Sequence, residues 1–216
     1  MPEVQMQEIT CPKCGKKHSF SVWDSINVME HPDMREKVRN DEAFRFQCPD
    51  CGASALLNYN FLYHDPEEKI FIFCNAEQTA CDEIRRVLTD ENNAFKNYTK
   101  RIVPSYNAFK EKLMIFDEGL DDRVIEWMKV FAFTSLRDKK PELRPERVLF
   151  DKGTDGNHYF RFGEKDRTVA AYAFERSLYN KIKNQWHDEI NDLSENRPVI
   201  NAEWAVKTLA AVQNRE

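Results

Sequence analysis

Apolar and polar residues alternate in the first third of the chain, which is the pattern of half-buried β-strands. Phe20, Val22 and Ile26 follow this alternation, and residues 44–47 form a second short stretch of the same kind. Residues 31–39 lie between these segments and carry a proline suited to a first helical turn, with an acidic residue close behind it. The pattern therefore predicts strands on both sides of a short inserted helix.

Two further apolar segments, residues 55–59 and 70–74, flank the turn-forming residues 64–69. Apolar runs separated by a turn rich in proline and charged residues are typical of a β-hairpin. We therefore expect residues 55–59 to pair with residues 70–74.

The middle of the chain has the period of amphipathic helices. One helix is predicted over residues 77–97, and a short strand over 98–103 separates it from a second helix, which Gly119 stops. Asp121 or Asp122 can cap a third helix. The apolar face of the second helix consists of Phe109, Leu113 and Phe116. That of the third consists of Val124, Ile125, Trp127, Met128 and Phe131.

The last third begins after residues 138–145, a charged connection that contains two prolines. Beyond it, a helix is predicted over residues 175–192, and Asn201 can cap a final helix. The strands predicted in this part of the chain are residues 148–150, 158–162 and 168–174.

Two copies of a Cys-Pro-x-Cys-Gly motif stand out from this pattern, at residues 11–15 and 48–52. Proline presets the backbone of the turn, and glycine after the second cysteine tolerates a positive φ. Together the motifs supply four thiolates, which is the ligand set of a tetrahedral structural zinc site. The predicted metal ligands are Cys11, Cys14, Cys48 and Cys51.

Zinc is the predicted cofactor, and iron is the alternative. Paired motifs of this kind also hold the single iron of rubredoxin-like sites, and tetrahedral sulfur alone does not separate the two metals. Disulfides are a weaker interpretation because the start of the chain has no signal-peptide pattern, and a reducing compartment favours metal ligation. We therefore expect a cytoplasmic protein.

Composition and charge narrow the classes of partner. The chain has 216 residues, 41% of them hydrophobic, and a net charge of −5. Residues 1–80 hold 8 Lys and Arg against 13 Asp and Glu, so the cysteine-rich part is acidic, which disfavours generic nucleic-acid binding. No apolar run is long enough for a transmembrane helix, so no membrane association is predicted.

The two Cys-Pro-x-Cys-Gly motifs, combined with the sequence Tyr-His-Asp-Pro at residues 63–66 and Gly-Leu-Asp-Asp-Arg at residues 119–123, resemble the CpXC proteins. This prokaryotic group has no assigned biochemical function. The resemblance extends from Ile9 to Lys129 and implies a metal-binding module with the four motif cysteines as ligands, fused to a helical and mixed extension. It does not imply a reaction.

The predicted fold class is α+β. Residues 1–75 are expected to form a zinc-ribbon-like β-module with one inserted helix. Residues 76–140 are expected to form a helical region packed on it, and residues 141–216 a C-terminal α+β region.

Other reactive side chains have structural interpretations. Cys74 and Cys81 are predicted to lie in the core, and Asp65 to form a turn. Asp121, Asp122 and Arg123 are expected to cap a helix or form salt bridges. Ordinary structural or surface roles are predicted for the five histidines, His18, His31, His64, His158 and His187. Of these, His18 can alternatively contact the ligands of the metal from outside the ligand set.

No P-loop, dinucleotide fingerprint, nucleophile elbow or HExxH motif occurs, and no catalytic residue is predicted. The favoured hypothesis is a zinc-binding, non-enzymatic module that interacts with a protein partner or regulates one. The alternatives are a nucleic-acid-binding zinc-ribbon protein and an enzyme whose site lies in residues 76–216, with the ribbon as an accessory.

Overall fold

The computed structural model of the protein describes residues 4–75, 82–90, 95–165 and 167–214. The chain divides into two compact units, residues 1–110 and 111–216, and the division falls within the helix α3 (Tyr106–Asp117). These units do not coincide with the three regions expected from the sequence, and that three-part organisation stays a prediction. Both helices and strands are present, so the predicted α+β class is confirmed.

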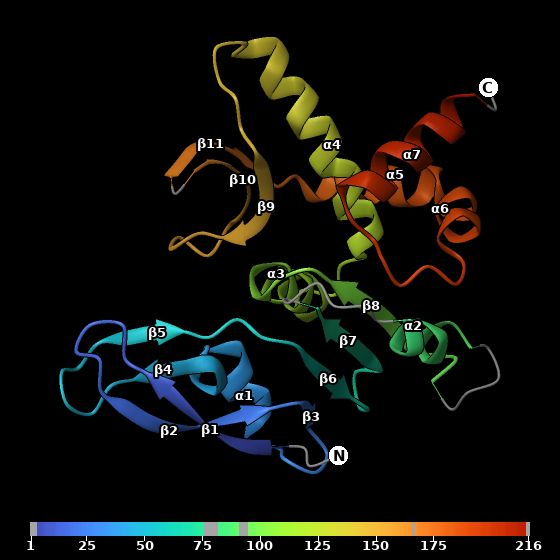
Figure 1. The fold of residues 1–216 in the computed structure, drawn as a ribbon. Coiled ribbons are helices and arrows are strands. Elements are labelled where there is room, and N and C mark those ends of the chain that lie inside the picture. Colours follow the sequence, from blue (N-terminus) through green and yellow to red (C-terminus); the bar gives the residue numbers. More distant parts are fainter. Residues whose placement is uncertain (1–3, 76–81, 91–94, 166, 215–216) are drawn as a thin grey trace. The chain divides into compact units, whose positions relative to one another are not determined.

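Two antiparallel hairpins carry the cysteine motifs in the first unit (Figure 1). The first pairs β1 (Val4–Thr10) with β2 (Lys17–Trp23), and the second pairs β4 (Arg45–Gln47) with β5 (Ser54–Leu56). Each Cys-Pro-x-Cys-Gly motif is the turn of its hairpin. The sequence between the hairpins contains a short helix α1 (Met34–Arg39), which confirms the predicted insertion.

A second sheet of this unit has the strand order β3-β6-β7-β8. Its outer pairs, β3 with β6 and β7 with β8, are parallel, and the central pair is antiparallel. The strands are β3 (Ser25–Asn27), β6 (Phe61–Asp65), β7 (Ile70–Cys74) and β8 (Thr99–Val103). The remaining elements of the unit are the short 3₁₀ helix η1 (Glu42–Phe44) and the helix α2 (Asp82–Thr89).

The predicted pairing of residues 55–59 with residues 70–74 is wrong. Residues 70–74 pair with Phe61–Asp65, and residues 54–56 pair with β4 instead. The reason is burial: in β6, Phe61, Tyr63 and Asp65 are 0–1% exposed. Because every second residue of a strand faces the same side, the buried face of β6 includes a charged residue that a search for apolar runs overlooks.

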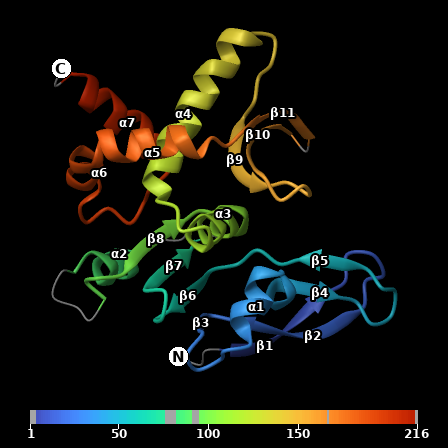
Figure 2. The same cartoon turned by 180° about the vertical axis from the view of Figure 1, so that it is seen from behind.

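In the second unit, α4 (Asp122–Lys139) lies between a three-stranded sheet and a group of helices (Figure 2). The sheet is an antiparallel meander of β9 (Arg147–Lys152), β10 (His158–Glu164) and β11 (Arg167–Ala173). The helices are α5 (Arg176–Gln185), α6 (His187–Ser194) and α7 (Ala202–Gln213). The three predicted strands are therefore confirmed.

The predicted caps are confirmed at the start of α4 and α7. Asp121 accepts a hydrogen bond from the backbone N–H of Arg123 at 3.0 Å, and Asn201 accepts one from the N–H of Trp204 at 2.9 Å. Each cap satisfies a backbone donor that has no partner inside its helix. None of the described helices is long and apolar enough to span a membrane.

The continuous helix predicted over residues 175–192 is wrong, because the chain leaves helical geometry at Trp186, where φ is −118° and ψ is 25°. The ring centroids of Trp186 and Trp127 lie 6.4 Å apart, and Trp127 is fully buried. Trp127 also stacks on Trp204 and donates from Nε1 to Thr208 Oγ1 at 2.8 Å. This packing of indole rings overrides the regular helical period.

Candidate metal centre

The backbone of the first motif forms a closed turn. The N–H of Cys11 donates to the carbonyl of Lys16 at 2.8 Å, and the N–H of Gly15 donates back to the carbonyl of Cys11 at 3.0 Å. These two hydrogen bonds close the turn that contains both cysteines and satisfy its backbone donors.

The second motif closes in the same way. The N–H of Cys48 donates to the carbonyl of Ala53 at 2.8 Å, and that of Gly52 donates to the carbonyl of Cys48 at 2.9 Å. Gly15 and Gly52 have φ values of 72° and 68°, in the left-handed region. An L-residue is strained in this region, which is the physical reason for glycine at this position of both motifs.

The two turns bring the four cysteine sulfurs together, all within 4.8 Å of one another. Sγ of Cys11 lies 3.6 Å from that of Cys51, and Sγ of Cys14 lies 3.7 Å from that of Cys48. In a zinc tetrahedron with Zn–S bonds of ~2.3 Å the sulfurs are about 3.8 Å apart. The arrangement therefore fits one metal ion at its centre, and the separations are far too long for disulfide bonds.

The apolar surroundings of this cluster are small. Cys11 and Cys48 are each 1% exposed, and Phe46, at 3%, is the buried residue that packs with them. The remaining contacts come from partly buried side chains, which are Ile9, Phe20, Cys51, Ala53 and Leu57. Two of the three buried residues are thus themselves candidate ligands. The hydrophobic effect alone therefore contributes little free energy to holding the hairpin tips together.

The environments of neighbouring thiols differ. The backbone N–H of Cys14 favours the thiolate of Cys11 and lowers the pKa of that thiol to about 6. For Cys14, the N–H of Lys16 acts in the same direction, but desolvation and the three adjacent thiols outweigh it and raise the pKa to about 12. A divalent cation at the centre would favour the thiolate form of all four cysteines.

A second group of potential ligands adjoins the first. His18, Cys48 and Asp50 also have ligand atoms within 4.8 Å of one another, and they share Cys48 with the four-cysteine cluster. No other group of three His, Cys, Asp or Glu within this limit is found among the residues that the structure describes, so the remaining histidines belong to neither cluster.

The family model of the CpXC proteins matches residues 9–129, which is more than half of the chain and includes both motifs. The chain belongs to the CpXC family. It is also 19% identical over 194 residues to an uncharacterized protein of Treponema pallidum (strain Nichols), an alignment that covers 83% of this chain and 88% of the relative. No solved structure matches. The CpXC assignment and the sulfur cluster together indicate a protein that can bind a metal ion.

Asp65, the acidic residue of the Tyr-His-Asp-Pro sequence in this CpXC chain, is completely buried. Its carboxylate accepts hydrogen bonds from the backbone N–H of Glu68 at 3.2 Å and from Arg35 Nη2 at 2.8 Å. The predicted role in the turn is confirmed, and the ion pair with Arg35 additionally ties α1 to β6.

The Gly-Leu-Asp-Asp-Arg sequence of the CpXC chain also has a structural role. Asp121 caps α4 and binds Arg123 Nη2 at 2.7 Å, whereas Asp122 is 1% exposed and lies 2.9 Å from Lys112 Nζ. Both predictions for this sequence, capping and salt bridging, are confirmed. Cys74 is fully buried, as predicted, and Cys81 lies outside the described residues.

Sequence reasoning missed a buried ionic network in the second unit. Lys129 Nζ lies 2.6 Å from Glu111 and 3.1 Å from Glu126, and Lys112 Nζ lies 2.9 Å from Glu126. Desolvation of Glu111 raises the pKa of its carboxyl, while the two lysines, despite desolvation, lower that of Glu126. Charged residues of a helix usually face solvent, so the sequence contains no signal for this network.

Proposed function

We propose that the protein binds one zinc ion through Cys11, Cys14, Cys48 and Cys51, and that the ion has a structural role. The observation that carries the proposal is the convergence of the four sulfurs within 4.8 Å. Closed tetrahedral sites of four thiolates are the usual form of structural zinc. Iron in the same site would instead give a redox centre, which visible absorption distinguishes.

A structural role follows from the number of ligands. Four thiolates complete the coordination of zinc and leave no position for water or substrate, so catalysis at this ion is not expected. Because the apolar cluster between the hairpins contains only Cys11, Phe46 and Cys48 as buried members, zinc binding is the main candidate for the free energy that holds the hairpins together.

Two matched alanine variants test this role. Cys48→Ala removes a proposed ligand, whereas Cys74→Ala removes an equally buried cysteine outside the sulfur cluster. We expect Cys74→Ala to retain about one zinc per chain and Cys48→Ala to lose it. After chelation, added zinc should restore the circular dichroism signal of the wild type but not that of Cys48→Ala. Equal zinc content in both variants would contradict the proposal.

The proposed biological role is that of a non-enzymatic module that binds or regulates another protein. On β1, Val4 and Met6 are 40% and 67% exposed, and within the described part of the chain β1 pairs with β2 alone. A strand with one unpaired edge and exposed apolar side chains suits addition of a strand from a partner.

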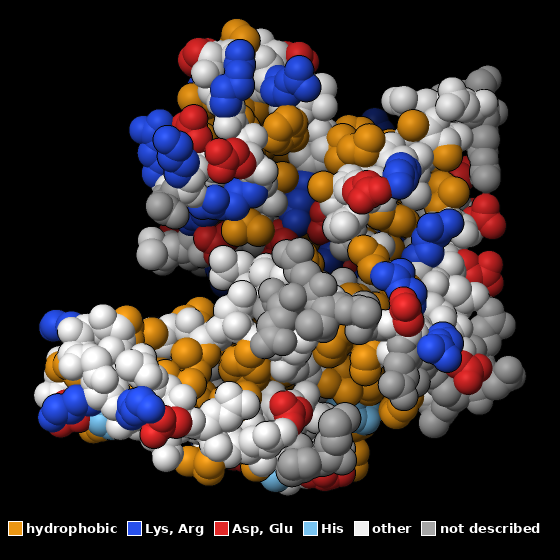
Figure 3. All heavy atoms as spheres, viewed as in Figure 1, with side chains coloured by type: hydrophobic (Ala, Val, Ile, Leu, Met, Phe, Trp, Pro, Cys, Tyr) orange, Lys and Arg blue, Asp and Glu red, His pale blue; other side chains and the backbone are white. Residues whose placement is uncertain are grey.

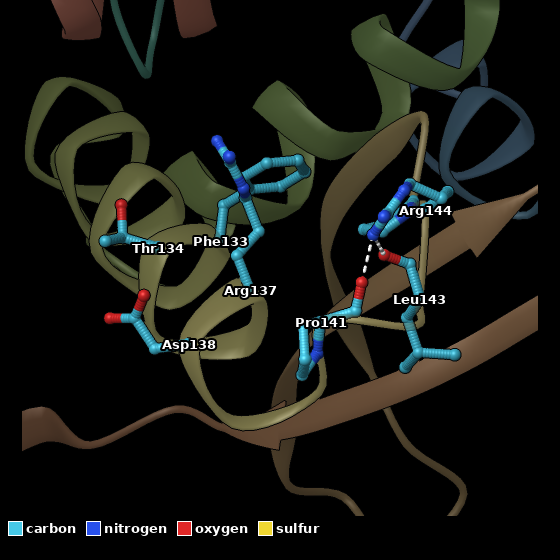
Figure 4. Close-up of a pocket in the computed structure, with 8 residues that line it drawn as sticks. Phe133, Thr134, Arg137, Asp138, Pro141, Leu143 and Arg144 are labelled. Atoms are coloured by element: carbon cyan, nitrogen blue, oxygen red, sulfur yellow. Dashed lines mark hydrogen bonds between the residues drawn. The ribbon is translucent and has the colours of Figure 1, made fainter.

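A hollow of about 730 Å³ lies between the end of α4 and the segment that follows it, and it lends little support to an enzyme (Figure 4). Its polar groups are Thr134, Arg137, Asp138 and Arg144, and Arg144 is held by the carbonyls of Pro141 and Leu143. This set contains no nucleophile paired with a base, which is what covalent catalysis would require.

Nucleic-acid binding has less support than protein binding. Lys16 and Lys17 are exposed near the first turn, but they pair with Asp50 at 2.6 Å and with Glu8 at 2.7 Å. Figure 3 shows basic and acidic side chains side by side over the hairpins. Phosphate binding needs unneutralised cations, and these lysines are already compensated.

The interaction role is tested with the zinc-loaded protein as bait in an extract of its natural host. Met6→Glu places a charge on the exposed face of β1, and Val206→Glu places the same charge on an exposed position of α7. We expect the wild type and Val206→Glu to capture the same partner protein, and Met6→Glu to lose it. Absence of any partner of the wild type, or equal binding by Met6→Glu, would contradict this role.

A further inference from the structure

His18 lies beside the sulfur cluster on β2, opposite Ile9 of β1. Its side chain is 18% exposed, and the ring centroids of His18 and Phe46 lie 6.0 Å apart. The Nε2 atom is 3.4 Å from Sγ of Cys48 and 3.1 Å from Oδ2 of Asp50. One ring nitrogen therefore faces two possible hydrogen-bond acceptors.

The chemistry of these neighbours assigns the proton. The Asp50 carboxylate is an acceptor, and a cysteine that ligates a metal is a thiolate, which is also an acceptor. Nε2 must carry a hydrogen to contact both groups, because an unprotonated nitrogen would direct its lone pair at two negative charges. The ring is thus a donor toward the metal site.

The position of the ring is itself supported. Asp50 Oδ1 accepts from Lys16 Nζ at 2.6 Å, so the carboxylate that contacts His18 through Oδ2 is held through its other oxygen. Lys16 and His18 belong to the first hairpin, whereas Cys48 and Asp50 belong to the second. The four residues form a polar chain that joins the two hairpins at the metal site.

Donors to the thiolates are needed because four thiolates around a divalent ion carry a net charge of −2, and hydrogen bonds spread this charge. Backbone N–H groups serve this purpose at other cysteines: that of Cys14 toward Cys11, and that of Ala53 toward Cys51. At Cys48, a side chain from the other hairpin also reaches the sulfur.

We infer that His18 is a positioning residue of the metal site, which donates from Nε2 to the Cys48 thiolate and slows loss of the ion. The inference rests on the proposed metal-binding function. It assigns to His18 a role outside the ligand set: the hydrogen bond orients Sγ and lowers its charge, so that protonation and displacement of this ligand become less favourable. His18 thereby connects metal retention to the contact between the hairpins.

The rate of metal release tests this role. Zinc-loaded wild type, His18→Ala, His18→Gln and His187→Ala are mixed with excess chelator, and the freed zinc is measured with a chromogenic dye. We expect about 10-fold or faster release from His18→Ala, the loss typical of groups that support metal ligands. His18→Gln keeps an N–H donor, so its release rate should lie between those of the wild type and His18→Ala. His187→Ala alters a histidine whose side chain is 64% exposed, and its release rate should match that of the wild type.

Cobalt substitution gives a readout that a general loss of stability would not change. In His18→Ala, the thiolate-to-cobalt charge-transfer band should move to lower energy, because the sulfur loses a hydrogen bond, while the intensity remains that of four thiolates. Wild-type release rates and an unshifted band in both His18 variants would overturn the inference, as would a wild-type spectrum with a nitrogen ligand. Failure of the wild type to bind zinc or cobalt would instead overturn the proposed function itself.

Discussion

At the residue scale, the two motif glycines impose the strictest backbone requirement of the metal site. Gly15 and Gly52 both have positive φ, and a Cβ built on either residue would meet no atom within 4 Å. A substitution by alanine would therefore introduce backbone strain but no steric clash. The free-energy cost of the left-handed conformation can thus be measured without a contribution from packing.

Gly15→Ala should destabilise the first hairpin by roughly 1–2 kcal/mol, the cost of an L-residue in the left-handed region, and should accelerate zinc release by chelators. Gly156→Ala is the matched control, because Gly156 has a φ of 80° and open surroundings but lies in a turn of the second unit. It should lower stability in denaturant unfolding by a similar amount and leave zinc release unchanged. Equal zinc release from both variants and the wild type would contradict this account of the turn.

The cysteines could be predicted because their spacing is local: each motif specifies its own turn, and the repetition supplies the full ligand set. The sequence offered a place for His18 beside the metal ligands, but its specific contact with Cys48 could not be predicted in the same way. This contact joins two residues 30 positions apart in the chain, and it depends on the register of β1 with β2 and on the approach of the two hairpins. Asp65 is a further example, since its burial follows from the pairing of β6 with β7.

At the element scale, α4 combines an apolar face with buried charges. Trp127 forms the centre of its packing, and the neighbouring Glu126 and Lys129 are 3% and 4% exposed. Periodicity predicted the helix and its cap but not this network, since the ion pairs depend on α3 lying against α4. The interruption at Trp186 has the same origin: the packing of one ring against Trp127 decides where a helix ends.

Lys129→Met should lower the free energy of unfolding by roughly 3–5 kcal/mol, because it leaves the carboxylates of Glu111 and Glu126 buried without this partner. Lys207→Met is the control, since Lys207 is 73% exposed and pairs with Glu203 on the surface of α7, where a pair contributes ~0.5 kcal/mol or less. Denaturant unfolding measures both. A loss below about 1 kcal/mol for Lys129→Met would show that the network contributes little.

At the scale of the whole molecule, the two units have separate sources of stability. The second unit contains the large apolar cluster around Trp127, whereas the hairpin end of the first unit contains the small cluster around Phe46. The metal ligands all belong to the first unit. Removal of the metal should therefore affect one unit far more than the other.

Hydrogen exchange of the full chain before and after chelation tests this asymmetry. We expect the amides of β1, β2, β4 and β5 to lose protection when zinc is removed, because the hairpins then depend on little apolar burial. Those of α4 and α7 should keep their protection. Loss of protection throughout the second unit would show that its folding requires the metal site.

The most direct test of the central claim is elemental analysis of the protein purified without added metal, together with its absorption spectrum. The account predicts about one zinc per chain and no visible absorption, as expected for a closed site of four thiolates. A folded protein without metal would contradict the metal-binding function. Iron with visible bands would contradict the structural zinc role and indicate electron transfer instead.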